Sequence, residues 1–186
     1  MKAILKLFRI LSSRLTQQGL RTTAIWAYAR GIPYITGMPI LKYSKITPQI
    51  YVGPQYRRLG KKLLENSGFE YSVNLRIEFD DAGAGLELRH YCYLPTIDDD
   101  APSLEHLEKG VQFIENALSN GGKIYIHCAA GVGRAPTLVA ALLISHGASI
   151  SSSLAKIERT RPFINIMPEQ MRQLKIWANS VENGKI

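Results

Sequence analysis

The chain has 186 residues, of which 46% are apolar, and this fraction is enough for a buried core and excludes global disorder. Two cysteines argue against a disulfide framework, and no C-x-x-C pair predicts a metal site. The net charge of +8 lies wholly in residues 1–45, which hold eight basic residues and no acid, whereas residues 46–186 hold fifteen of each. This balance gives nucleic-acid binding by residues 46–186 no support, and no nucleic acid is expected as a partner.

Residues 2–17 are predicted to form an amphipathic helix, whose apolar face carries Ile4, Phe8, Leu11 and Leu15. Its other side is basic, so contact with an anionic membrane surface through residues 1–18 is one expectation. Packing of the apolar face on the rest of the protein is a second, and a mitochondrial-type targeting presequence is a third. The next apolar stretch, 24–33, contains Arg30, Gly31 and Pro33 and is too broken for a spanning helix.

From residue 46 onward the chain alternates strand and helix patterns. Strands are predicted at 49–53, 71–75, 86–94 and 123–127. Helices are predicted at 57–67, where Gly60 weakens the pattern, and at 103–119, 135–146, 150–160 and 168–181. The alternation indicates an α/β fold with a mixed, mostly parallel central sheet flanked by helices on both faces. We therefore divide the chain into an N-terminal extension, residues 1–45, and one folded domain, residues 46–186.

The most informative segment joins the strand at 123–127 to the helix at 135–146. It contains Cys128 and Arg134, separated by five residues of which two are glycine. A glycine-containing loop that leads into a helix N-terminus presents backbone N–H groups and the positive end of the helix dipole, so it binds anions. That environment favours a thiolate at Cys128, and the planar fork of Arg134 can hold two phosphate oxygens. A buried core cysteine beside a surface arginine is the alternative reading of this spacing alone.

The pattern H-C-x-x-G-x-x-R between a strand and a helix resembles the phosphate loop of the cysteine-based protein tyrosine phosphatases, and is most similar to their small dual-specificity branch. The resemblance covers about residues 46–180, and includes 46–53, 73–76, 94–98 and 161–170. It implies that Cys128 attacks the phosphorus of a phosphate monoester, with no cofactor and no metal. It also implies that the substrate is bound by His127, Ala129, Ala130, Gly131, Val132, Gly133 and Arg134.

The resemblance further implies a general acid on a loop before the cysteine. In the related enzymes the acid follows a proline by three residues, and Asp98 lies three residues after Pro95 and thirty before Cys128. Asp98 is therefore the favoured acid. Asp99 fits if the loop is aligned on the Ala-Pro pair that follows, and Asp100 is the third candidate.

Ala135 departs from the pattern, because most family members carry serine or threonine directly after the loop arginine. That hydroxyl stabilises the cysteine sulfur as it leaves in the second step. The phosphatases of regenerating liver share this alanine, so the resemblance implies slow breakdown of the phosphocysteine, unless Thr137 or a water substitutes. The chain ends Asn183-Gly184-Lys185-Ile186 and lacks their prenylation cysteine.

The extended recognition segment of the larger phosphatases is not visible, so phosphotyrosine and phosphoserine or phosphothreonine proteins are the expected substrates. A lipid phosphate is the alternative, because the mitochondrial phosphatidylglycerophosphate phosphatases share the loop pattern. Ala129 and Ala130 leave the loop without the lysine common in lipid-directed relatives. A weakly active module that binds phosphorylated partners is another alternative. A thiolate needs a reducing compartment, so the expected location is cytoplasmic, with peripheral membrane and mitochondrial locations as alternatives.

Four other residues have weaker predictions. His127 is expected to orient the loop through hydrogen bonds. Gln170 is expected on a helix surface, with a role in positioning water as the alternative. Cys92 is expected in a buried strand, with a protective disulfide to Cys128 as the alternative. Arg76 is expected either to contact a phosphorylated substrate or to pair with Glu78 or Asp80.

Overall fold

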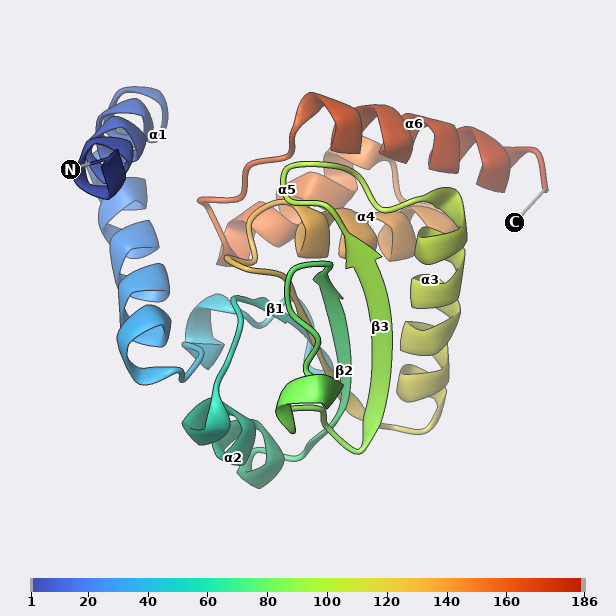
Figure 1. Ribbon diagram of the computed structural model, residues 1–186. Coiled ribbons are helices and arrows are strands. Elements are labelled where there is room, and N and C mark those ends of the chain that lie inside the picture. Colours follow the sequence, from blue (N-terminus) through green and yellow to red (C-terminus); the bar gives the residue numbers. More distant parts are fainter. Residues whose placement is uncertain (1, 185–186) are drawn as a thin grey trace.

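A computed structural model of the protein describes the backbone of residues 2–184 and the side chains of residues 15, 16 and 18–184. A sheet of parallel strands forms the centre of the fold (Figure 1). In spatial order the strands are β1 (Ile50–Gly53), β4 (Lys123–His127), β2 (Phe69–Arg76) and β3 (His90–Thr96). Within the described residues the antiparallel pairing is limited to an isolated bridge between Lys45 and Tyr51. The predicted α/β class is confirmed.

Helices cover both faces of the sheet, which confirms the expected layers (Figure 1). On one face α3 (Leu104–Ser119) and α4 (Arg134–Ser145) contact the strands, and α5 (Ile150–Thr160) and α6 (Pro168–Glu182) pack against α4. On the other face lie α2 (Arg58–Asn66) and the segment 77–89, which contains the short 3₁₀ turn Ala82–Ala84. A second 3₁₀ turn, Leu41–Tyr43, precedes β1.

The side chains of β4 alternate between these two layers, because successive residues of a strand point to opposite faces. Ile124 and Ile126 are buried in the core shared with α3 and α4. Tyr125 points to the other layer, where its ring packs against Tyr56, and the ring of His127 also packs on Tyr56. The strand thus sends His127 away from the face that Cys128 joins.

The predicted helices of the domain begin and end within two residues of the observed ones. The predicted strand 86–94 is wrong at its start, since β3 begins at His90. Leu86 and Leu88 instead enter the α2-side core with Tyr56. Gly60 interrupts the helical pattern for a steric reason: a Cβ there would lie 2.2 Å from the carbonyl oxygen of Gly37.

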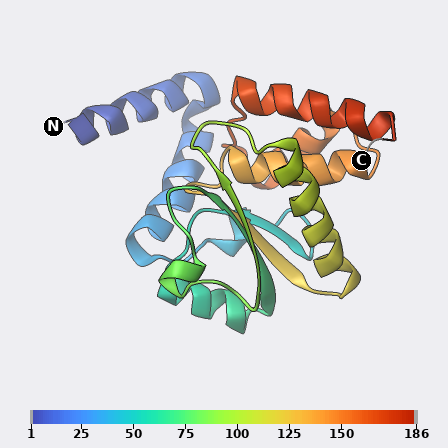
Figure 2. The ribbon, with the colours of Figure 1, turned by 45° about the vertical axis from the view of Figure 1, so that its right-hand side comes forward.

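Most of the extension forms the helical element α1 (Lys2–Thr36), which is broken at Gly19, where φ is 79° and ψ is 169°. Figure 2 shows the first segment projecting beyond the body of the protein. The predicted amphipathic face of residues 2–17 falls largely on side chains outside the described residues. The second segment packs through Trp26 and Ala29 against Phe163, beside Val132. None of the described helices is long and apolar enough to span a bilayer.

Candidate active site

Residues 128–133, the phosphate loop, join β4 to α4 at the carboxyl end of the sheet. Gly131 has a φ of 66°, and a Cβ there would lie 2.4 Å from the backbone carbonyl of Gly53, so the turn requires glycine. The N–H of Gly131 donates to Cys128 Sγ at 3.3 Å. The first N–H groups of α4 have no intrahelical partner, and Pro136 at its third position has none to satisfy. The loop and the start of α4 therefore supply backbone N–H donors beside Cys128.

A pocket opens over Cys128, which is 3% exposed. Segments far apart in the sequence line it, and its lining residues are Asp98, Asp99, Cys128, Ala130, Val132, Gly133, Arg134, Asn165 and Gln170. The structure thus brings together the three predicted catalytic residues. Ala129, Gly131 and the side chain of His127 are not among the lining residues, although the sequence predicted that they bind the substrate.

Arg134 is held by acceptors from two strand ends and two loops, and its side chain is 1% exposed. Nη1 donates to the carbonyl oxygens of Thr96 at 2.7 Å and Leu75 at 3.3 Å. Glu78 accepts from both terminal nitrogens, at 3.0 Å and 3.1 Å. Asp98 accepts from Nη2 at 2.6 Å. This network fixes the plane of the guanidinium at the mouth of the phosphate loop.

The sequence analysis named Glu78 only as a possible partner of Arg76, because its second partner, Arg134, is 56 residues away in the chain. Burial alone would raise the pKa of Glu78, but hydrogen bonds from Arg134 and Arg76 outweigh it and lower the pKa to about 2. Glu78 therefore stays charged and keeps its hold on Arg134. Arg76 donates to Glu78 at 2.8 Å, so of its two expected roles the pairing with an acidic neighbour is present.

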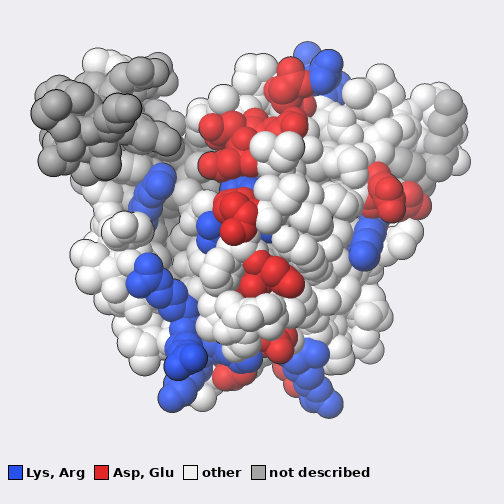
Figure 3. Space-filling view, viewed as in Figure 1, with Lys and Arg blue, Asp and Glu red and all other residues white. Residues whose placement is uncertain are grey.

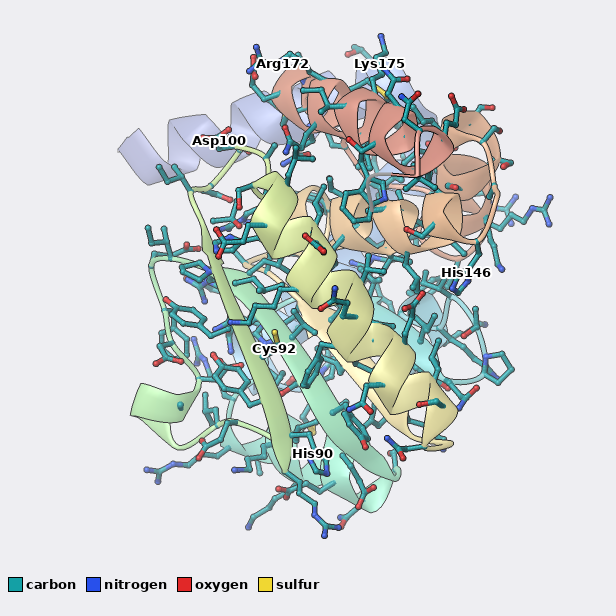
Figure 4. The ribbon with its side chains drawn as sticks, turned by 90° about the vertical axis from the view of Figure 1, so that its right-hand side faces the viewer. His90, Cys92, Asp100, His146, Arg172 and Lys175 are labelled. Atoms are coloured by element: carbon teal, nitrogen blue, oxygen red, sulfur yellow. The ribbon has the colours of Figure 1, made fainter. Side chains whose placement is uncertain are left out.

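The acidic loop after β3 separates its three carboxylates. Asp98 contacts Arg134, and Asp99, with a φ of 63°, also lines the pocket. Asp100 is not among the lining residues: its carboxylate accepts from the N–H of Ala101 at 2.7 Å, and Figure 4 shows it at the outer edge of the loop. The geometry leaves Asp98 and Asp99 as the carboxylates placed for proton transfer.

Gln170 corrects the sequence analysis, which expected a surface helix residue. Its side chain is 1% exposed and lines the pocket. Nε2 donates to the carbonyl oxygen of Asp100 at 2.9 Å, and Oε1 accepts from the N–H of Met167 at 3.0 Å. The first turn of α6 lies beneath the acidic loop, and tertiary packing of this kind leaves no local signal in a helical pattern.

Arg161 supports the phosphate loop from behind, and the sequence analysis assigned it no role. It is 1% exposed and donates to the carbonyl oxygens of Gly131 at 3.0 Å and Ala130 at 3.3 Å. It also donates to the carbonyl oxygen of Tyr43 at 2.6 Å, and Tyr43 ends the turn before β1. Burial lowers the pKa of Arg161 to about 10, so it stays charged at neutral pH. A buried cation thus binds the carbonyl oxygens of the loop, while the N–H of Gly131 donates to Cys128 Sγ.

His127 anchors the strand end next to Cys128. His127 and Asp81 are both fully buried, and Nε2 of His127 lies 2.7 Å from Oδ2 of Asp81. Burial would raise the pKa of Asp81, but the hydrogen bond and charge of His127 outweigh it and lower the pKa. Asp81 is therefore ionised and can only accept, so Nε2 carries the donated proton. This geometry fits the predicted orienting role of His127 and adds Asp81, which the sequence analysis missed.

The pairing predicts a stability effect for Asp81→Asn. The amide keeps one acceptor oxygen, but Asp81 accepts from both His127 and Gln55, so either the buried His127 or the half-buried Gln55 loses this acceptor. We expect a loss of about 1–3 kcal/mol in the free energy of unfolding, measured by urea denaturation at pH 7. In the wild type, the contribution of Asp81 to the free energy of unfolding should be lost as pH falls below the ordinary pKa range of aspartate, because folding lowers the pKa of Asp81.

The exposed Glu158 on α5 supplies the matched control, since Glu158→Gln makes the same change of carboxylate to amide at the surface. It should change the free energy of unfolding by about 0.5 kcal/mol or less. Equal effects of the two variants would contradict the buried-anchor interpretation of Asp81.

Cys92 is a buried residue of β3, as predicted, and Figure 4 shows it beneath α3. The alternative of a disulfide with Cys128 is excluded by the sheet order, because β2 lies between β3 and β4. Two strand spacings separate the backbones by about 9 Å or more. A disulfide needs a Cα separation of roughly 4.4–6.8 Å.

Comparisons with known proteins agree with this site. The family model described as "Dual specificity phosphatase, catalytic domain" matches residues 50–180. The chain belongs to the dual-specificity phosphatase family. It is therefore a phosphoric monoester hydrolase of the cysteine-based tyrosine phosphatase superfamily, and its small dual-specificity branch, inferred from the loop, is confirmed.

The names of individual relatives refer both to protein phosphatases and to a lipid phosphatase. The human "Phosphatidylglycerophosphatase and protein-tyrosine phosphatase 1" is 31% identical over 157 residues, which cover 76% of this chain and 78% of that protein. Human "Dual specificity protein phosphatase 26" is 31% identical over 152 residues, which cover 76% of this chain and 69% of that protein. The crystal structure of PTPMT1 superposes with a TM-score of 0.68 at 25% identity, covering 76% of this chain and 97% of that one. The chain spans 21% of the longer human "Dual specificity protein phosphatase 16".

Proposed function

We propose that this phosphatase hydrolyses phosphate monoesters through a phosphocysteine at Cys128. The observation that carries the proposal is the convergence of Cys128, Arg134 and Asp98 on one pocket. In the first step the Cys128 thiolate attacks phosphorus, a P–S bond forms, and the P–O bond to the leaving group breaks. The loop N–H groups and the Arg134 guanidinium bind the oxygens of the transferred phosphoryl group.

Asp98 supplies a proton to the leaving oxygen and then takes a proton from the water that attacks the phosphocysteine. That attack breaks the P–S bond and returns the thiolate with inorganic phosphate. In the free enzyme Asp98 lies on Nη2 of Arg134 at 2.6 Å, so the phosphate must displace it from the guanidinium. Displacement frees the carboxyl group at the pocket rim, where the leaving group emerges.

Phosphotyrosine and phosphoserine or phosphothreonine proteins are the proposed substrates. The loop has no lysine, and carboxylates stand at the pocket rim: Asp98 is 69% exposed on its side chain, and Glu78 is 37% exposed. Figure 3 shows acidic side chains gathered over this central part of the face. Such a rim opposes head groups that carry several phosphates but tolerates a single phosphomonoester on a peptide.

A lipid monoester is the second candidate, because the 31% identical human relative is named a phosphatidylglycerophosphatase. Phosphate release from a panel tests both: an aryl phosphate, phosphotyrosine and phosphothreonine peptides, phosphatidylglycerophosphate and phosphoinositides. Release from the peptides at the higher kcat/KM supports the protein proposal, and preference for phosphatidylglycerophosphate replaces it. No release beyond Cys128→Ser for any substrate would favour a module that binds phosphorylated partners.

Ala135 is proposed to slow the second step. Ala135 is fully buried in the first turn of α4, and the nearby Thr137 hydroxyl donates to the carbonyl oxygen of Gly133 at 2.9 Å. That proton is therefore not free to stabilise the departing sulfur. A hydrogen bond to a charged group contributes about 1.5–3 kcal/mol, so Ala135→Ser should accelerate phosphocysteine breakdown by about 10–100-fold.

Rapid mixing with an aryl phosphate measures this step. Wild type should give a burst close to one product per enzyme and then a slow steady state, whereas Ala135→Ser should raise the steady-state rate and reduce the burst. Ala140→Ser, a change at a second fully buried alanine of α4, is the control and should leave the slow phase unchanged. An unaltered steady state in Ala135→Ser would remove Ala135 as the cause of slow turnover.

A further inference from the structure

The second segment of α1, residues 20–36, is apolar on both of its sides. One side faces the domain and is buried through Thr23, Trp26, Ala29 and Pro33. The opposite side is exposed, yet it lacks the polar residues expected of a solvent-facing helix surface. We call this side the α1 outer face, and it consists of Leu20, Ala24, Ala27, Tyr28, Tyr34 and Ile35.

The exposure of the large residues on this face is high: 76% for Leu20, 75% for Tyr34 and 76% for Ile35. Tyr28, at the edge of the face, is 52% exposed, and its ring also contacts Tyr43. Elsewhere in the described part of the domain, Leu59 on α2 and Ile176 on α6 are single exposed hydrophobic residues, and the exposed Ile77 and Ile97 follow the paired ends of β2 and β3. Single exposed apolar residues need no explanation, but a contiguous apolar face marks an interaction surface.

Charge indicates which partner covers the α1 outer face. Arg21 and Arg30 are exposed on the same segment, and residues 1–45 contain no acidic residue. In Figure 3 the described surface of the second segment of α1 is uncharged apart from basic side chains, while the acidic groups gather over the centre of the view. A second copy of the chain would bring two basic faces together, which opposes association. An anionic bilayer offers both an apolar interior and complementary charge.

We propose that the α1 outer face docks onto an anionic lipid bilayer, with its apolar side chains in the interfacial layer and its arginines among the lipid head groups. Tyr28 and Tyr34 suit this position, because tyrosine combines an apolar ring with a polar tip that remains hydrated. The proposal concerns residues 20–36 and is distinct from membrane contact by residues 1–18.

Docking also places the pocket near the membrane. Trp26 packs with Phe163, and Val132, a lining residue of the pocket, packs against the same cluster. The phosphate loop is therefore one side-chain layer from α1. The position of the pocket near the membrane bears on substrate access, and this point rests on the proposed phosphatase function. Docking itself rests only on the surface of α1.

Co-sedimentation with vesicles tests the docking on the full chain carrying Cys128→Ser, so that hydrolysis plays no part. The vesicles are pure phosphatidylcholine, or phosphatidylcholine with about 30% phosphatidylglycerol. We expect binding to the anionic vesicles, weakened at about 1 M salt relative to about 0.1 M. The combined variant Leu20→Glu, Tyr28→Glu and Ile35→Glu should weaken binding by about 100-fold or more, because it adds charge where apolar burial is needed.

The matched control is the double variant Leu59→Glu and Ile176→Glu, which alters exposed apolar residues outside α1 and should bind like the parent protein. Unchanged binding by the triple variant would overturn the proposal, even if the vesicles still bound through residues 1–18. Circular dichroism and aryl phosphate turnover of the triple variant with Cys128 restored exclude misfolding as the cause of lost binding. A wild-type dimer without lipid that the triple variant dissociates would assign the face to self-association and also overturn the proposal.

Discussion

Replacing Cys128 by serine should lower kcat/KM for an aryl phosphate by roughly 10⁴-fold or more, because it removes the nucleophile on which both steps depend. The serine hydroxyl is far less acidic than a thiol and stays protonated in the pocket. The loop that binds phosphate is kept, so affinity for the substrate should survive. Steady-state kinetics and isothermal titration with a phosphotyrosine peptide measure the two effects separately.

Cys92→Ser is the matched control, since it makes the same atomic change at the other buried cysteine. Cys92 lies in the core beneath α3 and outside the pocket lining, so the variant should keep its turnover within a few-fold and lose some stability instead. Residual hydrolysis in Cys128→Ser close to that of the wild type would reject a phosphocysteine route. A comparable loss of turnover in both variants would point to general disruption of the core.

The site components that the sequence could predict are those that lie together in the chain. A strand, a glycine-containing turn and a helix N-terminus follow one another between residues 123 and 146, and their local geometry already determines an anion site. Cys128 and Arg134 could be found because that geometry depends on neighbouring residues only. The acidic loop could be placed to within two residues, and the structure then reduced the candidates from three to two.

The residues that support the loop come from elsewhere and have no local pattern. Glu78, Asp81 and Arg161 each act across tens of residues, and a charged residue in an irregular segment is most often solvated. Their burial follows from packing between the sheet and its outer segments. Gln170 was misplaced for the same reason, since a helix pattern says which face is apolar but not which loop covers its first turn.

In the second segment of α1 the sequence-based expectation failed for a different reason, because tertiary packing overrides helix propensity there. Gly31 and Pro33 indicated a broken stretch, yet the helix continues to Thr36. Burial of Trp26 and Ala29 against Phe163 offsets the unfavourable residues. The sequence analysis correctly predicted that this stretch does not span a membrane. Its apolar outer face could be recognised only in the structure, which shows the side that the domain covers.

The second large effect is expected for Asp98→Asn, because an amide cannot donate the proton that a carboxylic acid supplies to the leaving group. The kcat/KM for a phosphothreonine peptide, which reports the first step only, should fall by roughly 10²–10⁴-fold, because its alkoxide leaving group is strongly basic. The kcat/KM for an aryl phosphate with an acidic phenol should fall much less, since its leaving group departs with little protonation. The dissociation constant of the substrate should not rise, because the change removes the carboxylate that competes with phosphate for Arg134 Nη2.

Asp99→Asn and Asp100→Asn decide between the neighbouring carboxylates. Asp99 lines the same pocket, so geometry alone allows it to act, whereas Asp100 is turned away. If Asp98 is the acid, dependence on the leaving group should steepen in Asp98→Asn only. A steeper dependence in Asp99→Asn, with Asp98→Asn changing KM alone, would assign proton transfer to Asp99 and leave Asp98 as a reversible partner of Arg134. The leaving-group slope separates these cases because it reports proton transfer directly, while a lower rate alone does not.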